Sequence, residues 1–134
     1  STGEYVNGKT GHSEWNIYKY GLPCVTVLIG IYDRSTGNPV GGVVNQPFCY
    51  FDEESQKWHG KAYWGISYGG TNVHNVVINN DTQSAHPVIV ISSSEDKKLQ
   101  ELLGKHFQLV HATGAGYKLL TVAVGYAVAY ICSK

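Results

Sequence analysis

The first half of the chain carries the apolar pattern of β-strands joined by tight turns. Apolar and β-branched residues fill several short runs, and each run ends at a cluster of turn residues such as Gly69-Gly70. Runs of this kind are typical of antiparallel hairpins. We expect the first strand to be buried on both faces, since its apolar residues do not alternate with polar ones, and the second to end at Pro47. The strands that this pattern predicts are residues 25–32, 40–46, 61–68 and 71–78.

Two polar stretches flank these strands and predict loops. Residues 1–20 are rich in glycine, and Gly3, Gly8 and Gly11 lie too close together for a helix, so we predict an extended loop there. Residues 52–60 are polar and predict a further turn.

The second half alternates strand-like and helix-like segments. Residues 88–91 predict a short buried strand. Three leucines at helical spacing follow it and predict an amphipathic helix, with the serines of residues 92–94 as its cap and Gly104 at its end. The elements predicted next are a strand over 107–110, a helix over 117–126 and a strand over 128–132.

This order of elements predicts a layered α/β fold class, in which an antiparallel β meander precedes a β-α-β-α-β unit. The strands of such a unit are parallel and joined by right-handed crossovers. We therefore divide the single region into an antiparallel sheet portion, residues 1–80, and an α/β portion, residues 81–134, that would bind the ligand.

The glycine-bearing turn at residues 111–118 lies beyond the carboxyl end of a predicted strand, where ligands of open α/β sheets bind. Gly114 and Gly116 let the backbone approach a ligand without a Cβ in the way. The first amides of the following helix carry partial positive charge, and Lys118 adds a full charge. We interpret the turn as an anion site. On the local pattern alone, an ordinary helix start that contains glycine stays open as an alternative.

The composition of the chain limits the classes of ligand that the glycine turn could bind. The 134 residues make one domain, and 43% hydrophobic content is enough for a packed core. Ten Lys and Arg balance ten Asp and Glu, which argues against a nucleic-acid binder or a polybasic membrane surface, so any phosphate recognition is local. The widely spaced Cys24, Cys49 and Cys132 predict core packing and reduced thiols. The lack of a leader-like or membrane-spanning pattern, together with these thiols, predicts a cytoplasmic location.

Other candidate sites carry less weight. The six histidines show no zinc-ligand spacing, and no Gly-x-Ser-x-Gly sequence marks a nucleophile. Asp52, Glu53 and Glu54 could hold a hard cation, but acids in a polar turn are more often solvated. The aromatic-rich residues 58–65 could stack bases, although packing is the favoured interpretation without excess basic charge.

Several sequence blocks together resemble one enzyme family over essentially the whole chain. Their order and spacing are similar to the central portion of the inositol polyphosphate 1-phosphatase family, which are magnesium-dependent, lithium-sensitive phosphomonoesterases. The NQP block is shared with a sister family of 3'(2'),5'-bisphosphate nucleotidases, whereas Tyr117 and the Ser1-Thr2 start favour the inositol enzymes. The blocks are GLPCVTVLIGIYD at residues 21–33, GVVNQPF at 42–48, WHGKAYWGISY at 58–68, GTNVH at 70–74 and GAGYK at 114–118.

The resemblance implies roles for five residues. Thr2 would orient the water that attacks phosphorus, and Ser1 with Thr2 would hold the reacting 1-phosphate. Gly114 and Ala115 would contact the inositol ligand, and Lys118 would pair with its 4-phosphate. The resemblance also implies Mg²⁺ as the cofactor and inositol 1,4-bisphosphate and inositol 1,3,4-trisphosphate as small-molecule substrates, with neither nucleic acid nor a membrane as partner.

The sequence departs from the family's pattern at both ends. It begins after the two aspartates of the family's Asp-Pro-Ile-Asp-Ser-Thr motif and stops before a Trp-Asp segment, so the resemblance places the metal carboxylates outside residues 1–134. Phosphoryl transfer relies on metal ions, so we expect this piece alone to be inactive and to leave sheet edges open. A bisphosphate nucleotidase and a non-catalytic phosphate-binding module stay open as alternatives.

Overall fold

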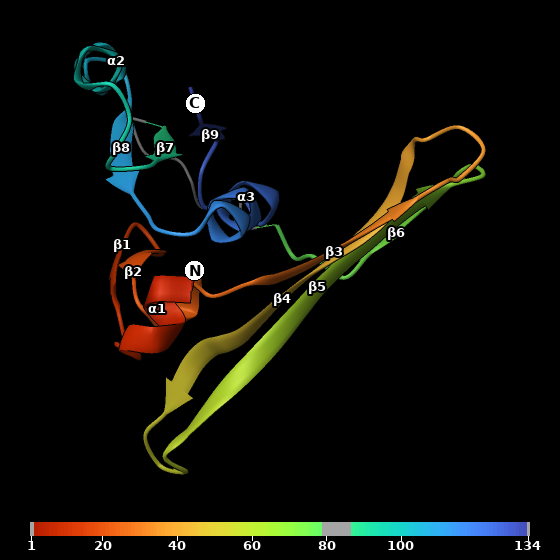
Figure 1. Ribbon diagram of the computed structural model, residues 1–134, viewed down its shortest axis with the longest axis horizontal. Coiled ribbons are helices and arrows are strands. Elements are labelled where there is room, and N and C mark those ends of the chain that lie inside the picture. The colour runs from red at the N-terminus through yellow and green to blue at the C-terminus, as the bar shows by residue number, and fades with distance from the viewer. Residues whose placement is uncertain (1, 79–86, 134) are drawn as a thin grey trace.

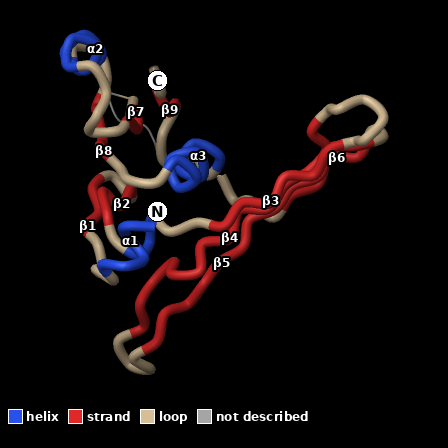
Figure 2. The backbone as a smooth tube through the Cα atoms, viewed as in Figure 1, coloured by secondary structure: helices blue, strands red, loops and turns tan. Residues whose placement is uncertain are grey.

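The computed structural model describes residues 2–78 and 87–133 and joins a long antiparallel ribbon to an α/β body (Figure 1). The ribbon is a four-stranded sheet ordered β3-β4-β5-β6, and the body contains a parallel sheet ordered β8-β7-β9 and a β1-β2 hairpin (Figure 2). The predicted boundary at residues 80 and 81 lies outside the described residues. The elements in chain order are α1 Thr2–Asn7, β1 His12–Glu14, β2 Ile17–Tyr20, the 3-10 helix η1 Leu22–Cys24, β3 Val27–Tyr32, β4 Pro39–Asp52, β5 Lys57–Tyr68, β6 Thr71–His74, β7 Val88–Ile91, α2 Lys97–Gly104, β8 Gln108–His111, α3 Ala115–Ala123 and β9 Ala129–Ile131.

The parallel sheet confirms the predicted β-α-β-α-β order. β7 lies in the middle and pairs in parallel with both β8 and β9, and all four of its residues are buried. Helix α3 packs on the sheet face that carries Val88, Val90 and Val110. Leu109 belongs to the alternate face, where it lies near Gly104 of α2. The α/β body is therefore where the core sits.

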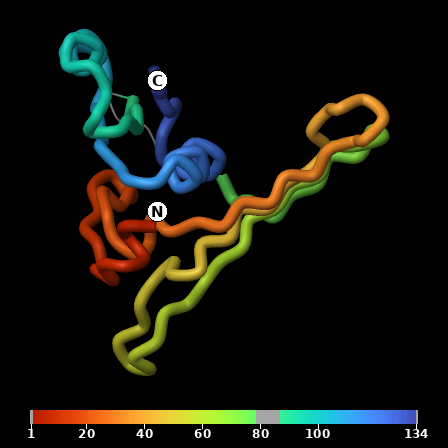
Figure 3. Tube along the Cα trace, in the orientation of Figure 1, coloured from red at the N-terminus to blue at the C-terminus, as the bar shows by residue number. Residues whose placement is uncertain are grey.

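The predicted loop over residues 1–20 is wrong. Residues 2–20 contain α1 and the β1-β2 hairpin, and these elements lie beside the last third of the chain, as the colour gradient shows (Figure 3). The amide of Thr113 donates to the carbonyl of Lys19 at 3.1 Å, and Ile17 is fully buried. The glycines make this segment a poor helix former by itself, and packing against β8 and α3 supplies the stability that it lacks locally.

Strand β3 forms within the predicted range, but its predicted burial on two faces is wrong in this chain. Val27, Leu28 and Ile29 are all about half exposed, at 52%, 51% and 57%. β3 is an edge strand of the ribbon, and the apolar side chains of the ribbon that pack on the core are partly buried ones such as Val44 and Tyr63. The apolar run thus lacks the covering layer that its composition calls for, as we expected for an incomplete piece.

Pro47 does not end its strand, contrary to the prediction. β4 continues to Asp52, and its pairing with β5 shifts register between Gln46 and Tyr50, which marks a bulge around the proline. A bulge removes the need for a ladder amide that proline lacks. Gly60 on β5 allows the close approach, since a Cβ there would lie 3.2 Å from the Pro47 carbonyl oxygen. The predicted turn shortens accordingly, because β5 begins at Lys57.

Helix α2 ends at Gly104 as predicted, but its cap differs. The carboxylate of Asp96 accepts from the amides of Lys98 and Leu99, at 2.9 and 3.1 Å, so Asp96 is the N-cap rather than one of the serines. An aspartate in this position satisfies two of the helix's unpaired donors.

The predicted packing role of the cysteines holds for one of them. Cys24 is fully buried, and burial raises the pKa of its thiol to about 11. Cys132 is exposed because it follows the last core strand, so core packing is wrong for that residue, and Cys49 is partly buried.

Candidate functional site

The order of the parallel strands creates one preferred place for a ligand. β7 connects through α2 to β8 on one side, whereas β9 lies on its other side, so the chain reverses its direction of travel at the junction of β7 and β9. Ligands of open α/β sheets bind beyond the carboxyl ends of the strands at such a switch point. Ser92 directly follows β7, and Cys132 and Ser133 directly follow β9.

Lys118 delivers its ammonium group to this switch point. It lies one turn into α3, is 4% exposed, and donates from Nζ to the Ser92 hydroxyl. The Tyr130 ring of β9 lies beneath the ammonium, with 4.8 Å between Nζ and the ring centroid. Burial lowers the pKa of Lys118, and the nearby Cys132 and Glu95 oppose that shift. The structure thus holds a cation at the carboxyl edge of the sheet.

Glu95 and Ser133 join the two sides of the switch point, and sequence analysis gave neither of them a role there. Glu95 is 6% exposed, and its carboxylate accepts from the Ser133 hydroxyl and, at 3.4 Å, from the Ser133 amide. The signal that could have identified Glu95 is an acid four residues after a fully apolar strand, on the edge where parallel strands end.

The glycine turn begins α3 as predicted, with Gly114 at the N-cap and a φ of 79°. The amide of Lys118 donates to the Gly114 carbonyl at 3.1 Å, so residues 115–117 precede the first helical hydrogen bond and leave their amides for other acceptors. Ala115 is exposed there. These amides fit the predicted anion site.

At both glycines of the turn, protein atoms occupy the space that a Cβ would take, while contact of Gly114 with a ligand stays a prediction. A Cβ on Gly114 would lie 2.8 Å from the Cys24 carbonyl oxygen. A Cβ on Gly116 would meet the side chains of Thr26 and Leu28. The absent side chains therefore let η1 and β3 approach α3, and the contact they permit is with protein.

Ser1 lies outside the described residues, and Thr2 is exposed at the start of α1. α1 is tied to η1, because the Glu4 carboxylate accepts from the Gly21 amide at 2.5 Å. η1 also packs against Gly114 through Cys24. The structure therefore connects Thr2 and the glycine turn through one short element.

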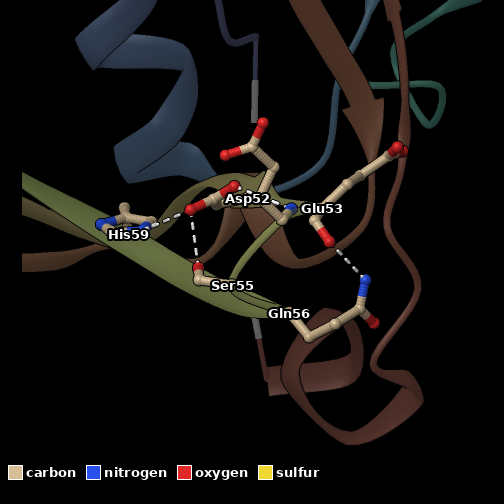
Figure 4. A network of polar contacts seen from close by, with 6 residues as sticks. Asp52, Glu53, Ser55, Gln56 and His59 are labelled. Carbon is tan, nitrogen blue, oxygen red and sulfur yellow. Dashed lines mark hydrogen bonds and ion pairs between the residues drawn. The ribbon is translucent and has the colours of Figure 1, made fainter.

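The acidic turn lies in the ribbon, between β4 and β5 (Figure 4). The Asp52 carboxylate accepts from the Ser55 hydroxyl at 2.6 Å and from the Glu54 amide at 3.0 Å, and His59 lies 3.6 Å from it. The Ser55 hydroxyl lowers the pKa of Asp52. Glu53 and Glu54 are exposed to solvent. Asp52 therefore serves the local hydrogen bonds of the turn, and the two glutamates are solvated.

The aromatic-rich segment serves packing, at least at Trp58. Its ring meets Phe48 edge-on at 5.9 Å and Phe51 at 5.4 Å between centroids. Phe48 in turn lies 6.1 Å from Tyr5 of α1. Trp58 therefore holds one arm of the ribbon together.

The family resemblance implies a metal, and the donors in the described ranges do not fit one. Among residues 2–78 and 87–133, no three His, Cys, Asp or Glu side chains gather as a metal-binding group, and the Glu95 carboxylate is used by Ser133. Within the same ranges, no helix is both long and apolar enough to cross a membrane.

Comparison with known proteins gives the family of the chain. The chain is 39% identical to inositol polyphosphate 1-phosphatase of Mus musculus and 37% identical to that of Homo sapiens, and it spans 38% of the length of each. It is also 33% identical to 3'(2'),5'-bisphosphate nucleotidase 1 of Dictyostelium discoideum over 81% of the chain. The sequence profile of the inositol monophosphatase family matches residues 1–134. The chain therefore belongs to the inositol monophosphatase family.

Proposed function

We propose that the complete protein removes the 1-phosphate of inositol polyphosphates, with inositol 1,4-bisphosphate and inositol 1,3,4-trisphosphate as substrates. The observation that carries the proposal is the Lys118 ammonium at the β7–β9 switch point, on a helix whose first turn has no side-chain cap. A cation beside helix amides suits a phosphate group. The similarity to inositol polyphosphate 1-phosphatases over the whole chain supports this substrate class.

We assign the residues of this chain binding and positioning roles. The α3 start, at Gly114 and Ala115, would contact the inositol ligand, and Lys118 would pair with its 4-phosphate. Ser1 and Thr2 would hold the 1-phosphate, and Thr2 would orient the attacking water. The shared packing of α1 and Gly114 on η1 supports a common site for these residues.

The family is metal-dependent, and we propose Mg²⁺ as the metal of the complete protein. Bound metal ions neutralise phosphate charge and activate water. The metal-ligating side chains of the described residues do not fit Mg²⁺, so we assign the residues of this chain only binding and orienting roles.

We propose the cytoplasm as the compartment and a small molecule as the ligand.

A bisphosphate nucleotidase is the second candidate, because the chain also resembles one. Phosphate release by the complete protein from inositol 1,4-bisphosphate and from adenosine 3',5'-bisphosphate separates the two. We expect a higher kcat/KM for the inositol substrate. A preference for the nucleotide would overturn the proposal, and so would tight binding of either compound with no phosphate release in the presence of Mg²⁺.

The role of Lys118 is tested by Lys118→Gln in the complete protein. Loss of a charge-assisted contact is expected to raise the KM for inositol 1,4-bisphosphate about tenfold or more. Lys105→Gln is the matched control, since Lys105 is exposed and precedes β8 at the opposite edge of the sheet. An unchanged KM in Lys118→Gln would remove Lys118 from the site.

A further inference from the structure

The Lys118 ammonium is buried without a carboxylate beside it. In the described ranges, the ion pairs do not include this lysine, and Glu95 acts on it only through its more distant charge. Its immediate neighbours are the hydroxyl of Ser92 and the ring of Tyr130. An amine that is 4% exposed needs such neighbours, because burial penalises its charged form.

These neighbours come from the two strands that flank the switch point. Tyr130 is the central residue of β9 and lies opposite Val90 of β7 in the sheet register. Ser92 follows β7 by one residue. Burial raises the pKa of Tyr130 and the nearby Cys132 adds to the rise, whereas the nearby Ser92 opposes it. The two side chains therefore define one position for the ammonium between β7 and β9.

An aromatic ring and a hydroxyl hold a cation without neutralising it. A carboxylate partner would cancel the lysine charge, whereas the ring attracts the ammonium through its electron-rich face and adds no formal charge. Ser92 adds a neutral acceptor. The ammonium is thus held in place, and neither of these two contacts carries a formal charge that would compete with an incoming anion.

We propose that Tyr130 is a positioning residue for Lys118: its ring holds the ammonium at the β7–β9 switch point and thereby sets the affinity for a substrate with a second phosphate. This inference rests on the proposed function, in which Lys118 pairs with that phosphate.

The test compares steady-state kinetics of the complete protein with inositol 1,4-bisphosphate. Tyr130→Leu is expected to raise KM about fivefold to tenfold, with kcat within about twofold of the unmodified protein, and Tyr130→Phe is expected to keep KM near its original value because it retains the ring. Tyr126→Leu is the matched control, since Tyr126 packs against the same core, whereas the ring beneath the ammonium is that of Tyr130. Equal KM values in Tyr130→Leu and Tyr126→Leu would overturn the inference, as would an equal rise in Tyr130→Phe.

Two further arms separate this inference from the proposed function and from a folding defect. In a Lys118→Gln background, Tyr130→Leu is expected to change KM by less than about twofold, because the ring acts through the lysine. If Lys118→Gln raises the KM for inositol 1,4-bisphosphate above that of the unmodified protein and Tyr130→Leu does not, the inference fails and the proposed function stands. If Lys118→Gln has no effect, the role assigned to Lys118 fails and this inference fails with it, whereas the comparison of inositol 1,4-bisphosphate with adenosine 3',5'-bisphosphate still decides the proposed function.

Replacing Tyr130 with a trifluorinated phenylalanine keeps the shape and weakens the ring's attraction for cations, so KM is expected to rise several-fold relative to Tyr130→Phe at an unchanged unfolding temperature. An unchanged KM there would overturn the inference even if Tyr130→Leu does not fold.

Discussion

The carbonyl oxygen of Cys24 faces Gly114 so closely that a Cβ on residue 114 would lie 2.8 Å from it. The φ of Gly114 is 79°, a backbone conformation that side chains disfavour. The start of α3 therefore depends on glycine for two separate reasons, the backbone angle and the contact with η1.

Gly114→Ala is expected to lower the free energy of unfolding of the complete protein by about 2–4 kcal/mol, because strain and overpacking add. Gly37→Ala is the control. Gly37 has a φ of 72°, and a Cβ on this residue would meet no atom within 4 Å, so the substitution carries only the strain, about 1 kcal/mol. Urea denaturation measures both, and equal losses would contradict the role of the Cys24 contact.

Gly116→Ala is expected to destabilise the protein by about 1–3 kcal/mol, although alanine favours helices. A Cβ at residue 116 would lie 2.5 Å from a methyl group of Leu28. Leu28→Ala removes that methyl group at low cost, since Leu28 is 51% exposed, and should recover part of the loss in the double variant. Denaturation of all four proteins gives the coupling. Strictly additive losses would show that the two residues do not meet.

Tyr117→Phe is expected to cost about 1–2 kcal/mol of unfolding free energy, because the Tyr117 hydroxyl accepts from the Tyr18 amide at 2.9 Å. Burial also raises the pKa of Tyr117, so the hydroxyl stays protonated over the working range of pH. Tyr68→Phe, at a residue that is 61% exposed, should leave stability unchanged. Thermal unfolding distinguishes the two, and similar melting temperatures would contradict the hydrogen bond.

Lys118→Met is expected to stabilise the complete protein at neutral pH, and the gain should shrink at alkaline pH. Burial places the folded pKa of Lys118 below its ordinary value of 10.5. Between those two pKa values the unfolded chain binds more protons than the folded one, so this lysine makes stability rise with pH. Melting temperatures from neutral pH to pH 10.5 measure the difference. Lys105→Met should show no such trend, and a gain that is constant with pH would be the contrary result.

Asp96→Ala is expected to destabilise α2 by about 1 kcal/mol, since the cap accepts from two amides. Ser93→Ala tests the serine cap that the sequence suggested, and we expect no loss because Ser93 is exposed and precedes the cap. Urea denaturation compares them. A larger loss at Ser93 would restore the serine as the cap.

The elements of the α/β body were predicted well because the residues that determine them lie close together in the sequence. The buried run of β7 and the helix stop at Gly104 each depend on residues within one turn or strand. The glycine turn was predicted to begin a helix and does so, but Gly114 and Gly116 serve packing against Cys24 and Leu28, which lie about ninety residues away in the sequence.

The failures share a physical cause, which is contact with distant segments. The fold of residues 1–20 depends on β8 and α3, and the bulge at Pro47 depends on Gly60 of the neighbouring strand. The exposure of β3 depends on what lies over the ribbon, and a strand's composition does not contain that information. The neighbours of Lys118, namely Ser92 and Tyr130, come together only when the parallel strands pair.

Three distant parts of the chain are anchored on η1. The Glu4 carboxylate binds the Gly21 amide, the Gln46 amide donates to the Pro23 carbonyl at 2.7 Å, and Gly114 rests on Cys24. η1 therefore links the long ribbon to α3, the helix that carries Lys118. Because Gln46 belongs to the ribbon and Gly114 begins α3, we expect a shift at the base of the ribbon to move α3, and with it any ligand affinity that depends on Lys118.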